Sequence, residues 1–305
     1  MFKKLMLVSA VALSLAANAQ DSKKGFYLKA GGSYFIQTVP TNFPEVGGLA
    51  PRKSVYNTAG KLLSSEEISG SFGEGVRTNL VGGYRFTERL GFEMGVHYYM
   101  SNSKTMADYT NRPDGVVTHP IFGDLPKKVN SVSEGQISAF DLSPSVALYL
   151  GEVDKFEPYA KVGVIVPVYG YLDIKTTGSI VVGGNKFADF SKTDRVKPNP
   201  TIGFMSSLGT SYKFSSSVSA FIEVEYRNFT VKGKTKETIS STVNGMDNLS
   251  TLKVSEIHSN YVDVLDVNSN NSATGTFDAN RAKDELASYV SISGVGLTLG
   301  MRYNF

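Results

Sequence analysis

The sequence predicts an all-β fold, an up-and-down antiparallel barrel of eight strands that spans a membrane. Eight segments of roughly ten residues alternate apolar with polar or small side chains, which is the period of a strand with two unlike faces. Short and long connections between these segments alternate strictly along the chain. The 305 residues include 30 Gly, 18 Phe and 16 Tyr, a composition that favours strands over helices.

Composition and charge also exclude several classes of protein. The chain has no Cys, which excludes disulfide frameworks, thiolate zinc sites and iron–sulfur clusters. With 31 basic and 28 acidic residues the net charge is +3, and two of the lysines, Lys3 and Lys4, belong to the leader described next. The remainder is nearly neutral, so we expect no nucleic-acid partner, because such proteins carry a clustered basic face.

The first element is a secretory signal peptide. Lys3 and Lys4 precede an apolar run from Leu5 to Ala17, and the triplet Ala17-Asn18-Ala19 provides small residues for cleavage after Ala19. A membrane anchor is the alternative, but a spanning helix needs about 20 apolar residues. We therefore expect a signal peptide at residues 1–19, a barrel domain at residues 20–305, and membrane insertion through strands alone.

The eight strands follow in order, each with one apolar face. The last is the clearest, because apolar residues from Val295 to Phe305 alternate with small or polar residues from Gly294 to Asn304. The apolar faces are Phe26, Leu28, Ala30, Tyr34; Leu80, Tyr84, Phe86; Phe92, Met94, Val96, Tyr98, Met100; Phe140, Leu142, Val146, Leu148, Leu150; Ala160, Val162, Val164, Val166, Val168; Ile202, Phe204, Leu208, Tyr212, Phe214; Val218, Ala220, Ile222, Val224, Tyr226; and Val295, Leu297, Leu299, Met301, Tyr303, Phe305.

The connections between the strands fall into two classes. The short ones are Thr87–Leu90, Gly151–Glu157 and Ser215–Ser217, and the long ones are Ile36–Gly75, Ser101–Gly135, Tyr171–Lys197 and Thr230–Ala287. Membrane barrels show this order, with short turns at one rim and long loops at the other. Within the long loops we expect a hairpin turn at Gly183-Gly184 and a short helix at Ala279–Ala287. Further strands hidden in Thr230–Ala287, for instance Val254–Val267, would raise the number to ten.

The choice between a membrane barrel and a soluble lipocalin-like barrel depends on which face points outward. Charges and many glycines share the polar face, as a narrow crowded lumen requires, whereas glycine on a water-facing strand brings no packing gain. Apolar-face aromatics gather near the short turns, as in an interfacial aromatic girdle. The predicted lumen charges are Lys29, Arg77, Arg85, Glu93, Asp141, Lys161, Lys213, Glu223, Glu225, Arg227 and Arg302. The predicted girdle is Phe26, Tyr84, Phe86, Phe92, Tyr212 and Phe214, together with Tyr303 and Phe305.

The chain resembles the small outer-membrane β-barrels of Gram-negative bacteria, of the OmpA-barrel, OmpX and OmpW kind. The C-terminal Gly300-Met301-Arg302-Tyr303-Asn304-Phe305 is similar to the terminal strand signal read by the outer-membrane assembly machinery, with Tyr303 and Phe305 as its aromatic positions. Pro158-Tyr159-Ala160-Lys161 is similar to a strand opening of that family. The likeness covers the strand framework and not the loops. It implies an integral outer-membrane protein that depends on this machinery for biogenesis.

Eight strands leave an interior that side chains can fill, so the lumen charges are expected to pair and plug it. Arg85 and Glu93 flank one tight turn and are predicted to form such a pair. A gated ion path through the charges is the alternative. A catalytic pair of His97 and Asp141 lacks a nucleophile on an identifiable elbow, and we expect no catalytic residue, metal site or cofactor. Asp266–Asn271 begins like a calcium loop but lacks the required Gly and Glu.

The sequence therefore predicts an outer-membrane barrel with both termini on the periplasmic side. Its expected role is structural or in interactions, with extracellular loops that present a surface to an unidentified ligand. A narrow porin-like channel and an outer-membrane enzyme that modifies lipid or cleaves protein are the alternatives.

Overall fold

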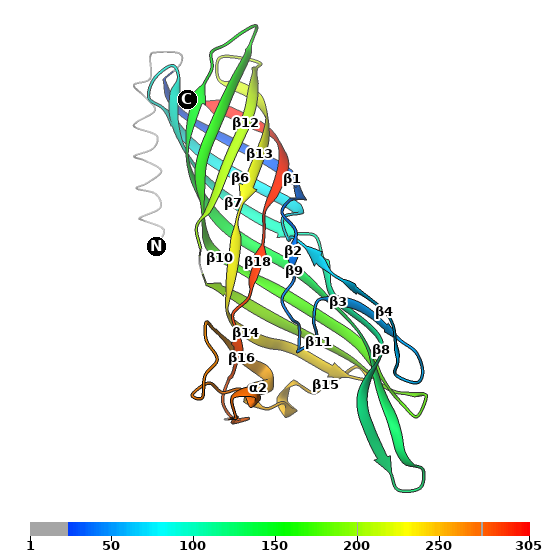
Figure 1. The fold of residues 1–305 in the computed structure, drawn as a ribbon. Helices are drawn as coiled ribbons and strands as arrows, with labels where there is room; N and C mark the ends of the chain where they lie inside the picture. The colour runs from blue at the N-terminus through cyan, green and yellow to red at the C-terminus, as the bar shows by residue number, and fades with distance from the viewer. Residues whose placement is uncertain (1–23, 200, 276) are drawn as a thin grey trace.

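A closed ring of antiparallel strands forms one end of the molecule in the computed structural model, which describes residues 24–199, 201–275 and 277–305 (Figure 1). Each strand pairs with the next, and the last pairs with the first, so the ladder closes on itself. Around the ring the strands are β1 (Gly25–Gln37), β6 (Gly75–Arg85), β7 (Leu90–Ser101), β9 (Gly123–Tyr149), β10 (Phe156–Val182), β12 (Gly203–Lys213), β13 (Val218–Asn228) and β19 (Gly294–Asn304).

The other end of the molecule is built from the remaining strands and the far halves of β9 and β10, which each run for 27 residues; we name it the distal lobe (Figure 1). Its other elements are β2 (Thr41–Asn42), β3 (Arg52–Tyr56), β4 (Leu62–Glu67), β5 (Ser69–Gly70), β8 (Lys104–His119), β11 (Asn185–Asn199), β14 (Thr230–Val243), β15 (Met246–Asp247), η2 (Leu249–Thr251), α2 (Val254–Ile257), β16 (His258–Val262), η3 (Ser272–Thr274), β17 (Lys283–Leu286) and β18 (Tyr289–Ser291). Among the described residues, no helix has the length and apolar character needed to cross a membrane.

The predicted long loops are thus largely strands. The hairpin turn at Gly183-Gly184 is confirmed, since both residues have positive φ and join β10 to β11. The helix predicted at Ala279–Ala287 is wrong, because β17 lies there and pairs in parallel with β16. Partners distant in sequence therefore decide the conformation of this segment. The strand within Val254–Val267 is β16, which pairs with β14 and β17 in the distal lobe and does not enter the ring.

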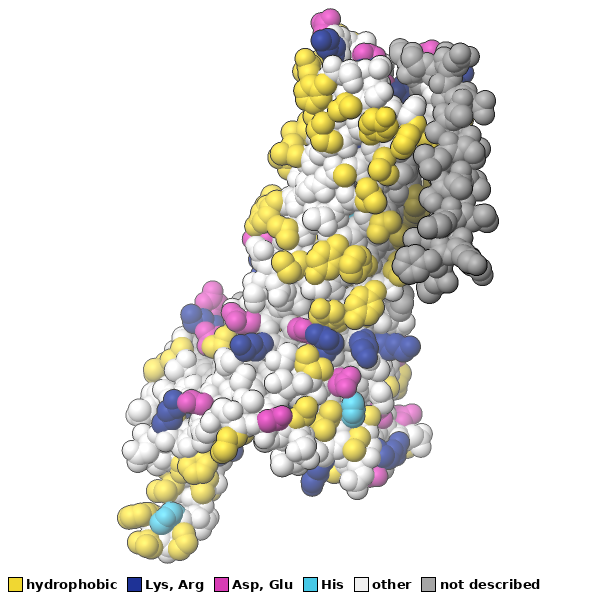
Figure 2. Space-filling model, turned by 180° about the vertical axis from the view of Figure 1, so that it is seen from behind, with side chains coloured by type: hydrophobic (Ala, Val, Ile, Leu, Met, Phe, Trp, Pro, Cys, Tyr) yellow, Lys and Arg dark blue, Asp and Glu magenta, His cyan; other side chains and the backbone are white. Residues whose placement is uncertain are grey.

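The ring strands turn their apolar faces outward. Leu80, Val96, Val224 and Leu299 are each between 47% and 57% exposed, whereas the polar side chains on the opposite faces are buried. Figure 2 shows hydrophobic side chains over the barrel and a row of charged ones where the barrel meets the distal lobe. The surface is therefore the reverse of a soluble barrel, with hydrocarbon outside and charge inside.

Glycines on the inward face make room for large neighbours. A Cβ atom on Gly83 would lie 2.2 Å from the ring of Tyr27, and one on Gly296 would lie 2.6 Å from the ring of Phe35. Outward-facing Gly82 has open space around it. The lumen is thus packed by pairing small residues with aromatic ones across neighbouring strands.

An apolar cluster closes the lumen towards the distal lobe. Phe72 and Met106 are fully buried in it, and Tyr99 donates a hydrogen bond to the carbonyl oxygen of Phe72 at 2.6 Å. The other buried members are Phe43, Val46, Ile137, Ile165, Leu172, Ile174, Val196, Met205, Phe229, Val231 and Ile292. The molecule therefore has a charged lumen in the barrel and an apolar core where the distal lobe begins.

Candidate functional site

The inward charges occupy the barrel in successive layers. Ten of the eleven residues predicted for the lumen are buried there, namely Lys29, Arg77, Arg85, Glu93, Asp141, Lys161, Glu223, Glu225, Arg227 and Arg302. Lys213 differs, since its side chain is 27% exposed and pairs with Glu152 at the rim of short turns. Lys213 is the last residue of β12, where the ladder ends at this rim.

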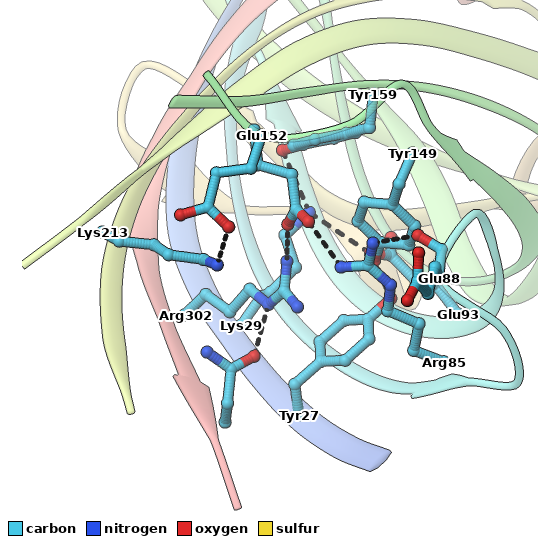
Figure 3. A network of polar contacts seen from close by, with 12 residues as sticks. Tyr27, Lys29, Arg85, Glu88, Glu93, Tyr149, Glu152, Tyr159, Lys213 and Arg302 are labelled. Atoms are coloured by element: carbon cyan, nitrogen blue, oxygen red, sulfur yellow. Dashed lines mark hydrogen bonds and ion pairs between the residues drawn. The ribbon is translucent and has the colours of Figure 1, made fainter. Parts of the chain in front are cut away.

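The layer nearest the short turns is centred on Glu157, which is bound by Arg85 and Arg302, both labelled in Figure 3. Its carboxylate accepts hydrogen bonds from Arg85 at 2.6 Å and from Arg302 at 3.2 Å. The predicted pair of Arg85 with Glu93 is therefore wrong. Arg85 lies opposite Gly91, not Glu93, in the β6–β7 ladder, and its side chain crosses the lumen to β10.

The second layer contains two lysines and two carboxylates that alternate in sign. Lys161 lies 3.1 Å from Glu93 and 2.8 Å from Glu223, while Lys29 lies 3.4 Å from Glu93 and also pairs with Glu223. Each charge thus faces two of opposite sign. This arrangement offsets the cost of desolvation better than an isolated pair would.

Three tyrosines connect and complete these two layers. Tyr27 donates a hydrogen bond to Glu93 at 2.9 Å and accepts one from Tyr149 at 2.8 Å. Tyr159 donates to Glu223 at 2.7 Å. The Arg85 guanidinium lies 3.9 Å from the centre of the Tyr149 ring, which places a cation over an aromatic face.

The third layer lies closer to the distal lobe. Arg77 binds Glu225 through two parallel hydrogen bonds of 2.7 Å, and Arg227 donates to Asp141 at 3.1 Å. Both guanidiniums lie near the ring of Phe35, at 4.7 and 5.5 Å from its centre. Fork-shaped pairing of this kind is the strongest geometry available to an arginine and a carboxylate.

His97 and Asp141 lie directly opposite each other in the β7–β9 ladder. The Nε2 atom of His97 is 2.5 Å from the Ser143 hydroxyl, but Asp141 is bound by Arg227 instead of by the imidazole. A Ser-His-Asp triad needs the carboxylate on the second imidazole nitrogen, which is missing here. His97 and Ser143 are both buried on the inward face of the barrel.

The void among the lumen charges has a volume of about 10 Å³, bounded by side chains of the second and third layers and by His97 and Ser143. That volume admits roughly one water molecule. The three layers of the lumen together contain six buried cationic side chains and five buried carboxylates, so their charges almost cancel. The carboxylates are Glu93, Asp141, Glu157, Glu223 and Glu225.

The predicted aromatic girdle lies on the outside of the barrel near the short turns. Phe26, Tyr84 and Phe86 pack in sequence, with ring centres 4.6 and 5.1 Å apart. Tyr303 and Phe305 form an edge-on pair at 5.1 Å. Tyr212 packs against Phe214, and exposed Phe92 lies on the same outward face. Phe156, which contacts Tyr212 at 5.0 Å, also belongs to this surface and was assigned to a turn in the sequence analysis.

Glu157 is a lumen carboxylate that sequence reasoning missed. It was assigned to the short connection Gly151–Glu157, although its even spacing from Tyr159 and Lys161 places it on the same face of the strand. That spacing was the available signal. No group of His, Cys, Asp or Glu residues in the described part of the chain is arranged to hold a metal ion. The segment Asp266–Asn271 folds on itself, with Asn268 and Ser269 bonded to Asp266.

A comparison with protein families agrees with this inside-out barrel. The family model for the outer membrane protein beta-barrel domain matches residues 5–258. The chain belongs to this family. The outer-membrane β-barrel family places the protein in the outer membrane. A search of curated proteins finds no match.

Two solved structures are similar to this outer-membrane barrel over most of its length. Neisserial surface protein A (NspA) is 13% identical, with a TM-score of 0.35 and coverage of 92% of this chain and 97% of that one. The outer membrane protein OprG from Pseudomonas aeruginosa is also 13% identical, with a TM-score of 0.42 and coverage of 93% and 97%.

Proposed function

We propose that this outer-membrane protein is an eight-stranded barrel with a sealed lumen, whose role is structural or in interactions through the distal lobe. The single observation that carries the proposal is the void of about 10 Å³ among the lumen charges. A channel for solutes needs a continuous water-filled path, and eight strands leave an interior that side chains fill. The paired charges therefore act as a plug that stabilises the barrel.

The same packing disfavours the two alternatives. A porin-like channel would require the second layer to open, which would separate Lys29 and Lys161 from carboxylates that they contact on two sides. An enzyme that uses His97 and Ser143 would need room for a substrate beside them, and they face a space of roughly one water molecule. We therefore assign no catalytic activity to the lumen.

The orientation follows from the outer-membrane fold. Short turns face the periplasm in such barrels and long connections face the exterior, so the distal lobe is extracellular and the C-terminus periplasmic. The exposed aromatic pair Tyr303 and Phe305 ends the last strand, in the position expected of an assembly signal. The predicted leader at residues 1–19 lies outside the described residues, and its cleavage remains part of the proposal.

Cysteine labelling tests this orientation directly, because the chain contains no Cys. Val264→Cys places a thiol in the distal lobe and Ser216→Cys places one in a short turn, and both side chains are exposed. A membrane-impermeant maleimide added to intact cells should label the first variant only, and both variants should react after lysis. Labelling of Ser216→Cys on intact cells, with Val264→Cys protected, would reverse the assignment.

A further inference from the structure

The β8–β9 hairpin projects from the distal lobe at the end of the molecule farthest from the barrel (Figure 1). We name its outer part, residues 116–126, the finger. β9 pairs with β10 only as far as Lys127, and the described ladder pairs of the finger join its own two strands, ending with His119 opposite Gly123. At its base, Gly183 donates a hydrogen bond to the carbonyl oxygen of Pro126 at 3.1 Å. Beyond this bond, the described ladders give the finger no third strand.

The tip of the finger is apolar. Ile121 and Phe122 follow each other in the turn and are 80% and 71% exposed, and Val116 and Val117 behind them are exposed as well. Figure 2 shows hydrophobic side chains gathered at the end of this projection, apart from those on the barrel. The bilayer around the barrel covers the barrel's apolar face but not the finger, which lies at the opposite end. An apolar group exposed in this way marks a site of contact with protein or lipid.

The backbone of the turn is already hydrogen-bonded. The Nδ1 atom of His119 accepts bonds from the N–H groups of Ile121 at 3.2 Å and Phe122 at 3.4 Å. Pro120 has no N–H group, and Gly123, with φ at +70°, lies opposite His119 in the ladder. An unpaired N–H group is costly in hydrocarbon, where water cannot satisfy it. The turn can therefore enter a bilayer without leaving these two donors unpaired.

The finger is also almost free of charge. Among residues 116–126, Asp124 is the one Asp, Glu, Lys or Arg, and its carboxylate accepts a hydrogen bond from the Thr118 hydroxyl at 2.7 Å. Directly behind the finger, Lys127 pairs with Asp114 at 2.7 Å. A zwitterionic phospholipid surface matches this pattern better than an anionic surface, which Asp124 would repel.

The size of the tip favours lipid over a protein partner. A large aromatic side chain buries at most about 250 Å², whereas each partner in a stable protein interface contributes roughly 800 Å². Ile121 and Phe122 at one turn therefore fall short of the area that a second copy of this chain or another protein would need. Insertion of a few apolar side chains at the boundary between headgroups and acyl chains has no such requirement, because its strength scales with the area inserted.

We propose that the finger inserts Ile121 and Phe122 into a second, apposed membrane with a zwitterionic phospholipid surface, and so binds the outer membrane to it. The inference rests on the extracellular placement of the distal lobe proposed above, and it names the partner for the interaction role of that lobe.

Tryptophan fluorescence tests the insertion, because the chain contains no Trp. Phe122→Trp carries a single indole on the finger, and Phe187→Trp, which replaces an equally exposed Phe in β11, is the matched control. Each protein is reconstituted in phosphatidylcholine nanodiscs and mixed with vesicles of phosphatidylcholine brominated in its acyl chains. We expect the vesicles to quench the indole of Phe122→Trp and to shift its emission to shorter wavelength, and to leave Phe187→Trp unchanged.

Co-sedimentation of the nanodiscs with sucrose-loaded phosphatidylcholine vesicles measures the affinity, with empty nanodiscs as the baseline. Ile121→Ser and Phe122→Ser should each lower the partition coefficient at least about ten-fold, since full burial of one such side chain is worth that much. Phe187→Ser should bind like the wild type. All three side chains are exposed, so heat-modifiable migration should not change in any variant.

An unquenched indole in Phe122→Trp, or equal losses of binding in the finger variants and in Phe187→Ser, would overturn the inference. Self-association of the nanodisc-embedded protein that Phe122→Ser abolishes, without binding to vesicles, would assign the finger to a second copy and also overturn it. Failure of the orientation is a separate result, because the maleimide would then label Ser216→Cys on intact cells while the finger still bound vesicles in vitro.

Discussion

The fork-shaped pair of Arg77 and Glu225 allows the plug to be measured as an energy. Both side chains are buried, at 3% and 1% exposure, and they form an ion pair with each other. Arg77→Met strands the carboxylate and Glu225→Leu strands the guanidinium, so each change should lower the free energy of unfolding by about 3–5 kcal/mol. The double variant leaves neither charge behind, and we expect it to be more stable than either single variant.

The assay is reversible urea unfolding of the barrel in lipid vesicles or detergent, analysed as a double-mutant cycle. The control is Lys186 with Asp189, an exposed pair at 2.7 Å in the distal lobe, whose coupling should not exceed about 1 kcal/mol. If the losses of Arg77→Met and Glu225→Leu simply add, the two charges do not depend on each other, and the reasoning that the plug is held by paired charges fails.

Three further predictions concern other parts of the chain. Gly83→Leu should prevent stable closure of the barrel, because the new side chain would collide with the inward-facing aromatic ring of Tyr27. The adjacent Gly82 faces lipid, so Gly82→Leu should migrate on gels like the wild type before and after boiling. Phe305→Asp should reduce the folded protein in outer-membrane fractions more than Asn304→Ala, because the first puts a charge at the lipid interface and the second faces inward; equal yields would refute the assembly role. Burial opposes ionisation of Glu285, but Lys236 and Lys283 outweigh it and hold the pKa of Glu285 below the usual 4.5. The ion pairs of Glu285 therefore contribute stability at neutral pH, and this stability is lost as the pH falls through the lowered pKa. The protection factors of amides near Glu285 against hydrogen exchange should fall in acid, and Glu285→Gln should remove that response.

Much of the barrel was predictable because alternation is a local property of a strand. Lys29, Glu93 and Glu225 could be assigned to the polar faces of their strands from parity alone, since neighbouring side chains point to opposite faces. The glycines and aromatics then indicated that these polar faces line the lumen. The ion-pair partners of the lumen charges could not be predicted in this way. Arg85 contacts Glu157 across the lumen, and that depends on the stagger of the ring, which no short stretch of sequence specifies.

The distal lobe was less predictable for a related reason. β17 is a strand because β16 lies beside it, so its conformation comes from a partner more than twenty residues away. The 27-residue lengths of β9 and β10 likewise depend on pairing with β8 and β11 in the distal lobe, which no short stretch of sequence specifies.

Single-channel recording tests the central claim most directly. The wild-type protein, refolded and shown to be heat-modifiable, is inserted into a planar lipid bilayer and held at voltages of either sign. A lumen with a void of about 10 Å³ should give no stable open level of porin size, and the baseline should match that of a bilayer without protein. Long-lived, porin-sized openings of the wild-type protein would contradict the sealed lumen.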